Sequence, residues 1–313
     1  MLYDLIIVGA GPSGLTASLY ASRYGLKHLI IGRSAGGTAA EAYQVENYPG
    51  CPAMTGNELM KKFLSQVREY GVELVNAEIK EIKKGTVFAV KTNLGQDFKT
   101  KTIILAMGLH HRTLDVPGEK EFFNRGVTYC PTCDGPLFKD KTVAVVGGGD
   151  SALTSSLFLS KIAKKVYLIH CKESFEGQKA WQEKISQEKR IVKILSRRIK
   201  EIQGQRFLTH VVLNEPYENE KKLSLDGLFI EIGSLPAGQE IKFGPNLEPE
   251  RDRSGYLIVD DFMQTNIPGL FAAGDITAPA GKLRQIITAA AEGAVSARGA
   301  QNFLAKNQSE TSR

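Results

Sequence analysis

The sequence lacks any long apolar run. None of its hydrophobic stretches approaches the ~18 residues that a membrane-spanning helix needs. The opening stretch, residues 1–8, has neither the charged start nor the cleavage site of a secretory signal, and it is typical of a strand. We therefore expect a soluble, cytoplasmic protein that does not enter a membrane.

A dense basic stretch is also absent. The chain has 40 Lys and Arg residues against 34 Asp and Glu residues, which gives a formal net charge of +6. No aromatic side chains are interleaved with basic ones in the manner of a single-strand binding surface. The excess charge is typical of a solvated surface, so we expect no nucleic acid partner.

Cysteine is scarce, with four residues in 313, and this is too few for a disulfide framework. Cys130 and Cys133 nevertheless form a C-x-x-C pair, which in a cytoplasmic chain indicates either redox catalysis or metal binding. A structural zinc ion needs four ligands, usually from two such pairs. Redox chemistry is therefore favoured, because the pair can close into a disulfide and pass two electrons to another disulfide.

The remaining composition, 42% hydrophobic and 24% charged residues, is that of a globular protein. A chain of 313 residues can form two domains that each bury a core. Strands are expected at residues 3–8, 29–31, 86–92, 102–106, 142–146, 166–169, 207–213, 228–232 and 255–259, and helices at 12–24, 59–70, 150–162 and 284–304. The pattern predicts an α/β fold.

The first of two glycine-rich turns follows the first expected strand. Gly9 would make the tight turn, Gly11 would let the backbone approach a pyrophosphate, and Gly14 would allow close helix packing. A G-x-G-x-x-G pattern alone is weak evidence, but the strand-helix-strand context favours a dinucleotide site at the helix N-terminus. The site residues predicted here are Gly9, Gly11, Pro12, Ser13 and Gly14.

The second turn begins at Gly147 and stands between another expected strand and helix. Alanine replaces the third glycine, which is an accepted variant. The two units amount to an internal repeat of supersecondary structure, one on either side of the cysteine pair. The site residues predicted in the second unit are Gly147, Gly149, Asp150, Ser151 and Ala152.

Two stretches have linker composition, residues 115–120 and residues 233–238. They separate the segment that contains the cysteines and the second turn from the rest of the chain. We therefore expect one domain to be inserted within another.

Taken together, these motifs resemble the low-molecular-weight thioredoxin reductases, which are FAD-dependent pyridine nucleotide-disulfide oxidoreductases of class II. The resemblance covers nearly the whole chain. The residues that carry it are Gly9–Gly14, Val45-Glu-Asn-Tyr-Pro-Gly50, Ala106-Met-Gly108, Arg112, Leu114, Pro117-Gly-Glu119, Cys130-Pro-Thr-Cys-Asp-Gly135, Gly147–Ala152, Ala273-Gly-Asp275 and Arg284-Gln285.

The resemblance implies two Rossmann-like, three-layer domains. An FAD-binding domain at residues 1–114 and 243–313 would be split by an NAD(P)-binding-like domain at residues 115–242 that carries the redox cysteines. It further implies a homodimer whose partner is thioredoxin or a thioredoxin-like dithiol protein.

The resemblance also implies roles for single residues. Asp275 should bind the ribitol or phosphate side of FAD, although a simple turn residue is the alternative, and Asn47 should lie beside the isoalloxazine. Gln285 opens a helix whose positive dipole end would favour reduced flavin. The further residues expected at the flavin are Gly108, Gly274 and Arg284.

The same resemblance implies that Cys133 exchanges electrons with the flavin and that Cys130 attacks the partner disulfide. Asp134 would then move the proton that a thiolate leaving group requires. The alternative for Asp134 is a capping or turn residue ahead of Gly135.

One stretch departs from the family pattern. NADPH-using members have His-Arg-Arg-x-x-Phe-Arg after the last strand of the second unit, whereas this chain has His170-Cys-Lys172-Glu-Ser-Phe-Glu176. A carboxylate would repel a 2′-phosphate but can accept a hydrogen bond from a 2′-hydroxyl. We therefore expect a nicotinamide dinucleotide near His170 and Lys172 but leave NADPH and NADH open.

Three functions follow from these observations. The first is a flavin-dependent disulfide reductase acting on thioredoxin. The second is a disulfide oxidoreductase or dithiol oxidase of the same fold whose donor is NADH, ferredoxin or a second flavin. The third is a flavin-binding sensor without catalytic activity, in which the cysteine pair would have no role.

Overall fold

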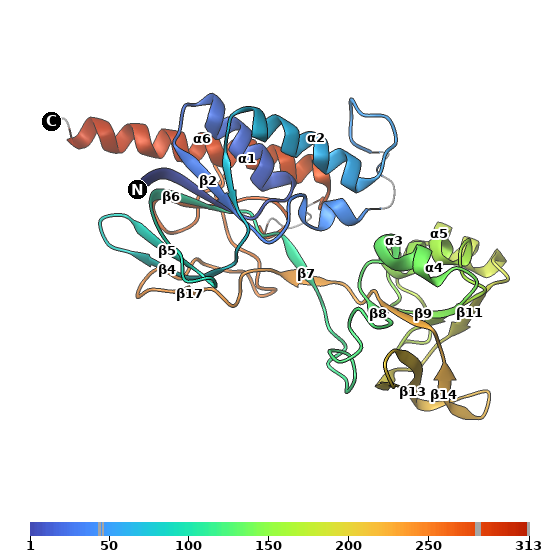
Figure 1. The fold of residues 1–313 in the computed structure, drawn as a ribbon. Coiled ribbons are helices and arrows are strands. Elements are labelled where there is room, and N and C mark those ends of the chain that lie inside the picture. The colour runs from blue at the N-terminus through green and yellow to red at the C-terminus, as the bar shows by residue number, and fades with distance from the viewer. Residues whose placement is uncertain (43–44, 46, 279–282, 312–313) are drawn as a thin grey trace. The chain divides into compact units, whose positions relative to one another are not determined.

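The chain divides into two compact units in the computed structural model. Unit 1 comprises residues 1–110 and 236–313, and unit 2 comprises residues 111–235. The structure describes residues 1–42, 45, 47–278 and 283–311, with residues 132–133 and 308–311 described by their backbone alone. Each unit is built on a sheet with helices packed against it (Figure 1). A search of the described residues for helices with the length and hydropathy of a membrane span finds none.

Unit 1 contains an eight-stranded sheet with the main order β17-β4-β5-β6-β1-β2-β3, and β18 also pairs with β6. Its strands are β1 (Leu2–Val8), β2 (His28–Ile31), β3 (Glu73–Val75), β4 (Ile79–Lys84), β5 (Phe88–Thr92), β6 (Asp97–Leu105), β17 (Lys242–Phe243) and β18 (Leu270–Ala272). The strands from β6 to β3 and β18 run parallel, while β5 is antiparallel to β4 and β6.

Three α-helices lie together on one side of this sheet (Figure 1). They are α1 (Pro12–Arg23), α2 (Gly56–Glu69) and α6 (Ile286–Thr311), and a short 3₁₀ helix, η1 (Gly37–Glu41), precedes α2. Thr55 starts α2 with a capping box. The Thr55 hydroxyl accepts a hydrogen bond from the Glu58 backbone N–H, and the Glu58 carboxylate accepts one from the Thr55 backbone N–H.

The central strand β1 is buried on both faces. Leu5 and Ile7 pack against the helices, and Ile6 and Val8 pack into the core on the opposite face. Because alternate side chains point to opposite faces of a strand, a strand covered on both sides needs a continuous apolar run. The sequence at residues 5–8 provides that run.

Unit 2 contains five parallel strands in the order β11-β10-β9-β15-β8. They are β8 (Val127–Thr128), β9 (Thr142–Val146), β10 (Lys165–Ile169), β11 (Ile191–Ile194) and β15 (Gly227–Ile230). The carboxyl end of the central strand β9 leads into the glycine turn.

The two faces of this sheet are covered differently. Val143 and Val145 pack with α4 (Asp150–Ser160) and α5 (Lys179–Gln187). Ala144 and Val146 pack with an antiparallel sheet of β12 (Ile199–Gly204), β13 (Leu208–Tyr217) and β14 (Glu220–Ser224). The short helices α3 (Pro131–Asp134) and η2 (Gly135–Phe138) contain most of the cysteine motif.

The chain crosses between the units at β7 (Leu109–His111) and β16 (Ser234–Pro236), which pair with each other. The compact units therefore change over at residues 110–111 and 235–236. The sequence placed these boundaries at residues 114–115 and 242–243. The difference at the first crossing arises because Leu114 and Asp115 donate their backbone N–H groups to Glu119, within unit 2.

The predicted α/β class with two Rossmann-like units is confirmed. The strand expected at residues 255–259 is wrong. Among the described residues, Leu257 makes only isolated bridges, to Arg251 and Thr277, and the preceding residues form a turn in which Asp252 accepts the N–H of Gly255. The apolar run is short, and no neighbouring strand pairs along its length within the described residues.

Candidate functional site

The carboxyl ends of three parallel strands meet at one edge of the unit 1 sheet. Val8 of β1 pairs with Leu105 of β6, and Leu105 pairs with Ala272 of β18. The predicted cofactor segments that follow these strands are the turn at residues 9–14, Gly108, and Gly274 with Asp275. Ligands of open α/β sheets bind outside this edge. The structure therefore brings together three segments that are far apart in the sequence.

The three glycines of the first turn differ in how much space a side chain would have at each position. Gly9 has φ +111°, and a Cβ there would stand 2.3 Å from the carbonyl oxygen of Ala106. A Cβ on Gly14 would stand 1.9 Å from the oxygen of Gly9. A Cβ on Gly11 would meet no described atom nearer than 4.0 Å. The fold itself thus requires Gly9 and Gly14, whereas Gly11 leaves open space where a phosphate can approach the backbone.

Helix α1 begins directly beyond this space. Gly11 occupies the N-cap position and Pro12 is the first helical residue, where its missing N–H is not needed. Ser13 is buried, and Gly274 packs so closely on it that a Cβ there would stand 2.5 Å from the Ser13 hydroxyl. No acidic side chain lies in the first turn of the helix. A helix N-terminus of this kind favours an anion.

The turn that carries Asp275 is held by a residue that the sequence did not single out. The Glu292 carboxylate of α6 accepts from the N–H of Gly274 at 2.8 Å and from the hydroxyl of Thr277 at 3.1 Å. Gly274 and Thr277 are both buried. An acid eighteen residues downstream in an alanine-rich helix provides no local signal of this role.

Asn47 and Gln285 meet although 238 positions separate them in sequence. Asn47 Nδ2 donates to Gln285 Oε1 at 2.9 Å. The Ala289 N–H donates to the Gln285 carbonyl, so Gln285 lies at the start of α6 as expected. The Arg284 guanidinium stacks on the ring of Tyr256, 4.1 Å from its centre.

In unit 2 the edge of the sheet again carries the predicted residues. Val146 of β9 pairs with Ile169 of β10 and with Ile230 of β15. The residues that follow these strands are Gly147, His170 and Glu231. Thr128, which ends β8, lies at the same edge because it pairs with Phe229. The cysteine motif and the second glycine turn therefore occupy one edge of one sheet.

The glycines of the second turn have the same steric roles as those of the first. Gly147 has φ +148°, and a Cβ there would stand 2.1 Å from the Glu231 carbonyl oxygen and 2.8 Å from the Ala152 Cβ. A Cβ on Gly149, the N-cap of α4, would meet no described atom within 4 Å. The small Ala152 is fully buried against the turn. As in unit 1, one glycine of the turn leaves space for a ligand.

Asp150 and Ser151 open helix α4. The Asp150 carboxylate accepts from the backbone N–H of Gln178 at 2.7 Å and from its side-chain amide at 3.0 Å. Asp150 therefore fixes the loop that follows β10, while Ser151 is exposed at the helix start.

Cys130 is disulfide-bonded, whereas Cys51 and Cys171 are free. The Cys133 backbone belongs to α3, but its side chain lies outside the described part of the structure. The Thr128 hydroxyl donates to the Asp134 carboxylate and accepts from the Cys130 N–H, the latter at 3.1 Å. Thr128 thus links the predicted acid to the predicted nucleophile, a role that the sequence did not indicate.

A buried carboxylate supports the residue before the cysteine pair. The Tyr129 hydroxyl donates to Glu119 at 2.7 Å, and the ring stacks on His111 at 5.6 Å. Burial, together with this hydrogen bond, raises the pKa of Tyr129 well above its usual range. Tyr129 is therefore neutral at physiological pH and ties the cysteine motif to the first crossing segment.

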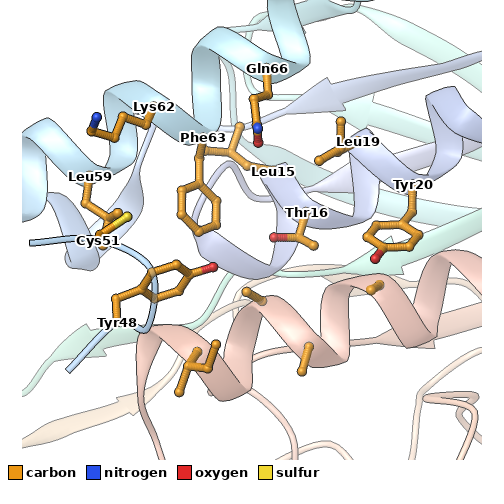
Figure 2. Close-up of a pocket in the computed structure, with 14 residues that line it drawn as sticks. Leu15, Thr16, Leu19, Tyr20, Tyr48, Cys51, Leu59, Lys62, Phe63 and Gln66 are labelled. Carbon is orange, nitrogen blue, oxygen red and sulfur yellow. The ribbon is translucent and has the colours of Figure 1, made fainter.

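A cavity of about 490 Å³ lies elsewhere in unit 1, among α1, α2 and α6 (Figure 2). Its lining is mainly apolar, with Leu15, Phe63 and Ile287, and it includes the half-buried thiol of Cys51. None of the predicted catalytic or cofactor residues whose side chains the structure describes lines it. The cavity is therefore separate from the strand edge at which those residues meet.

Comparison with known proteins shows the family of this chain. The sequence model of the family described as Pyridine nucleotide-disulphide oxidoreductase matches residues 3–293. The thioredoxin reductase of Listeria innocua serovar 6a is 38% identical over 307 residues, which cover 97% of this chain and 94% of that protein.

Two solved structures are similar over nearly their whole length. The thioredoxin reductase of Lactococcus lactis, in its FR conformation, has a TM-score of 0.85 and 35% identity and covers 97% of this chain and 99% of its own. That of T. acidophilum has a TM-score of 0.82 and 34% identity, with coverages of 96% and 98%. This chain belongs to the pyridine nucleotide-disulphide oxidoreductase family.

Proposed function

We propose that this protein is a flavin-dependent disulfide reductase that passes electrons through FAD to the Cys130–Cys133 disulfide and on to thioredoxin or a thioredoxin-like protein. The observation that carries the proposal is the cysteine motif itself. A disulfide-bonded Cys130 is joined through Thr128 to the Asp134 carboxylate, at the same sheet edge as a dinucleotide-type turn.

The residues of unit 1 fit FAD. Pyridine nucleotide-disulphide oxidoreductases bind FAD and NAD(P)H. The open space beside Gly11 and the N-terminus of α1 suit a pyrophosphate. Asp275 would bind the sugar or phosphate side, and Asn47 with Gln285 would lie at the ring. The residues of unit 2 from Gly147 to Ala152 would hold the nicotinamide dinucleotide in the same way.

When bound, FAD would supply the two-electron chemistry that reduces the Cys130–Cys133 disulfide. The resulting Cys130 thiolate attacks one sulfur of the partner disulfide, which forms a mixed disulfide and releases a thiolate. Cys133 then attacks the Cys130 sulfur, which re-forms the Cys130–Cys133 bond and releases the second partner thiolate. Asp134 would protonate the first leaving thiolate, take the proton of the Cys133 thiol as that sulfur attacks, and pass this proton to the second leaving thiolate.

Within the described residues, the chain passes between the units at residues 109–111 and 234–236. Each unit has its own hydrophobic core. We propose that they act as hinges, so that the cysteine pair alternates between the flavin and the partner protein. By the same resemblance we propose that the protein is a homodimer. We also propose that it acts in the cytoplasm, where free thiols such as Cys51 and Cys171 are maintained.

A second candidate is an enzyme of the same fold with a different donor or with electron flow in the opposite direction. It is favoured by one observation: Glu176 occupies a position where an NADPH enzyme of this family has arginine, and it is ion-paired with Lys172. NADH, ferredoxin or a second flavin would then replace NADPH.

The test is an anaerobic titration of the FAD-loaded protein. We expect NADH or NADPH to bleach the flavin absorbance and, when oxidised thioredoxin is added, thioredoxin thiols to appear. Cys130→Ser should still allow bleaching but should abolish thioredoxin reduction. Bleaching by reduced ferredoxin alone would favour the second candidate. Thioredoxin reduction by Cys130→Ser at the wild-type rate would refute the proposal.

A further inference from the structure

The loop between β10 and α5 folds back over the glycine turn of unit 2. The backbone N–H groups of Glu176 and Gly177 donate to the carbonyl oxygen of Gly148, at 2.8 and 3.0 Å. The His170 imidazole lies against the same glycine, because a Cβ on Gly148 would stand 2.2 Å from the ring. The loop therefore borders the position where a Rossmann-type unit holds the adenosine ribose, beyond the second strand.

His170 offers a hydrogen-bonding atom at this position. The residue is only 5% exposed, and its Nε2 has no hydrogen-bond partner among the described residues. Burial lowers the pKa of His170, so the ring is neutral near pH 7. A neutral imidazole nitrogen can bond to a hydroxyl but offers no charge to a phosphate.

The charged groups of the loop are already paired with each other. The Lys172 ammonium contacts Oε1 of Glu176, and Oε2 of Glu176 lies 4.0 Å from His170 Nε2. The hydrogen bond from Lys172 lowers the pKa of Glu176, so this carboxylate is ionised. Residues 170–178 contain one lysine and no arginine. A ribose held here would meet a neutral ring and an anion.

We infer that the donor is NADH rather than NADPH and that Glu176 is the residue that selects it. The 2′-hydroxyl of NADH can donate to the Glu176 carboxylate or bond to His170. The 2′-phosphate of NADPH would bring a second anion beside that carboxylate, and the one lysine of the loop, Lys172, is already paired with Glu176. The inference rests on the proposed function, because it keeps the reduction of thioredoxin through FAD and the Cys130–Cys133 disulfide. From the second candidate it takes only NADH as the donor.

The experiment measures dinucleotide binding without thioredoxin. Isothermal titration of the FAD-loaded, oxidised protein with NAD⁺ and with NADP⁺ gives both dissociation constants. The variant Glu176→Gln removes the anion and releases Lys172. Glu173→Gln is the matched control, because Glu173 is an exposed residue of the same loop and the charge change is identical. Anaerobic bleaching rates with NADH and NADPH provide a second readout.

We expect wild type to bind NAD⁺ about tenfold more tightly than NADP⁺, and Glu176→Gln to tighten NADP⁺ binding by about tenfold. Glu173→Gln should change the ratio by less than about twofold. The inference would be overturned if wild type bound NADP⁺ more tightly than NAD⁺, or if the two variants had equal effects. It would also be overturned if neither dinucleotide bound. NAD⁺ preference without thioredoxin reduction would instead refute the proposed function and leave the donor assignment standing.

Discussion

Glu292 holds the turn that carries Asp275, and its removal should loosen both the fold and the flavin site. The hydrogen bonds from Gly274 and Thr277 both end on the same carboxylate oxygen. The Thr277 hydroxyl also donates to the Gly274 carbonyl, 3.1 Å away, so the bond from the Gly274 N–H is the larger of these two losses. A hydrogen bond to a charged group contributes about 1.5–3 kcal/mol. We expect Glu292→Ala to lower the free energy of unfolding by about 2 kcal/mol.

Because Asp275 directly follows Gly274, the same change should weaken FAD binding by about tenfold. Urea unfolding of the apoprotein followed by circular dichroism measures the first effect, and FAD titration followed by flavin fluorescence measures the second. Glu292→Gln keeps a side-chain oxygen and should recover most of both losses, while Glu240→Ala, at an exposed position of unit 1, controls for charge. The reasoning would be refuted if Glu292→Ala matched wild type in both assays. It would also be refuted if Glu292→Gln were as impaired as Glu292→Ala.

Three further predictions concern other parts of the chain. Thr128→Val removes the hydroxyl that orients Asp134, so kcat for thioredoxin reduction should fall about tenfold with little change in KM. Gly135→Ala places a Cβ 2.9 Å from the Phe158 ring, so the free energy of unfolding should fall by about 1–2 kcal/mol in urea titrations. Burial lowers the pKa of His28, so this residue binds fewer protons in the native state than in the unfolded state. His28 should therefore decrease stability as the pH falls below about 6.5, and its own contribution to the slope is at most about 1.4 kcal/mol per pH unit.

Each of these predictions has a matched control. Thr128→Ser retains the hydroxyl and should keep kcat near wild type, so an equal loss in both variants would contradict an orienting role. Gly85→Ala meets no described atom within 4 Å and should be neutral. His28→Gln should flatten the slope between pH 7 and pH 5, and an unchanged slope would show that His28 is not the group responsible.

Local features of the chain were readable in the sequence. Gly9 and Gly147 sit in positive-φ turns that follow apolar strands, and a turn of this kind is determined by residues adjacent in sequence. The predicted helices after both turns begin at the expected residues, Pro12 and Asp150. The family resemblance, the α/β fold class and the flavin disulfide reductase class are confirmed for the same reason, because ordered local motifs carry them.

The prediction from sequence was wrong where a structural element needs a neighbouring segment in order to form. The run at residues 255–259 is apolar like a buried strand, but a strand forms only when a neighbour satisfies its backbone groups. Nothing in the sequence indicated that Thr128 would bridge Cys130 and Asp134, since a threonine at the end of a strand is ordinary.

Only the tertiary structure decided which distant residues share an environment. It placed Glu292 on the Gly274 turn, Asn47 on Gln285, and the cysteine motif at the same sheet edge as the second glycine turn. Glycine turns and helix starts depend on backbone sterics within a few residues, and these are fixed as soon as the amino acids are chosen. Side-chain contacts between segments depend on strand order and register, which emerge only when the whole core packs.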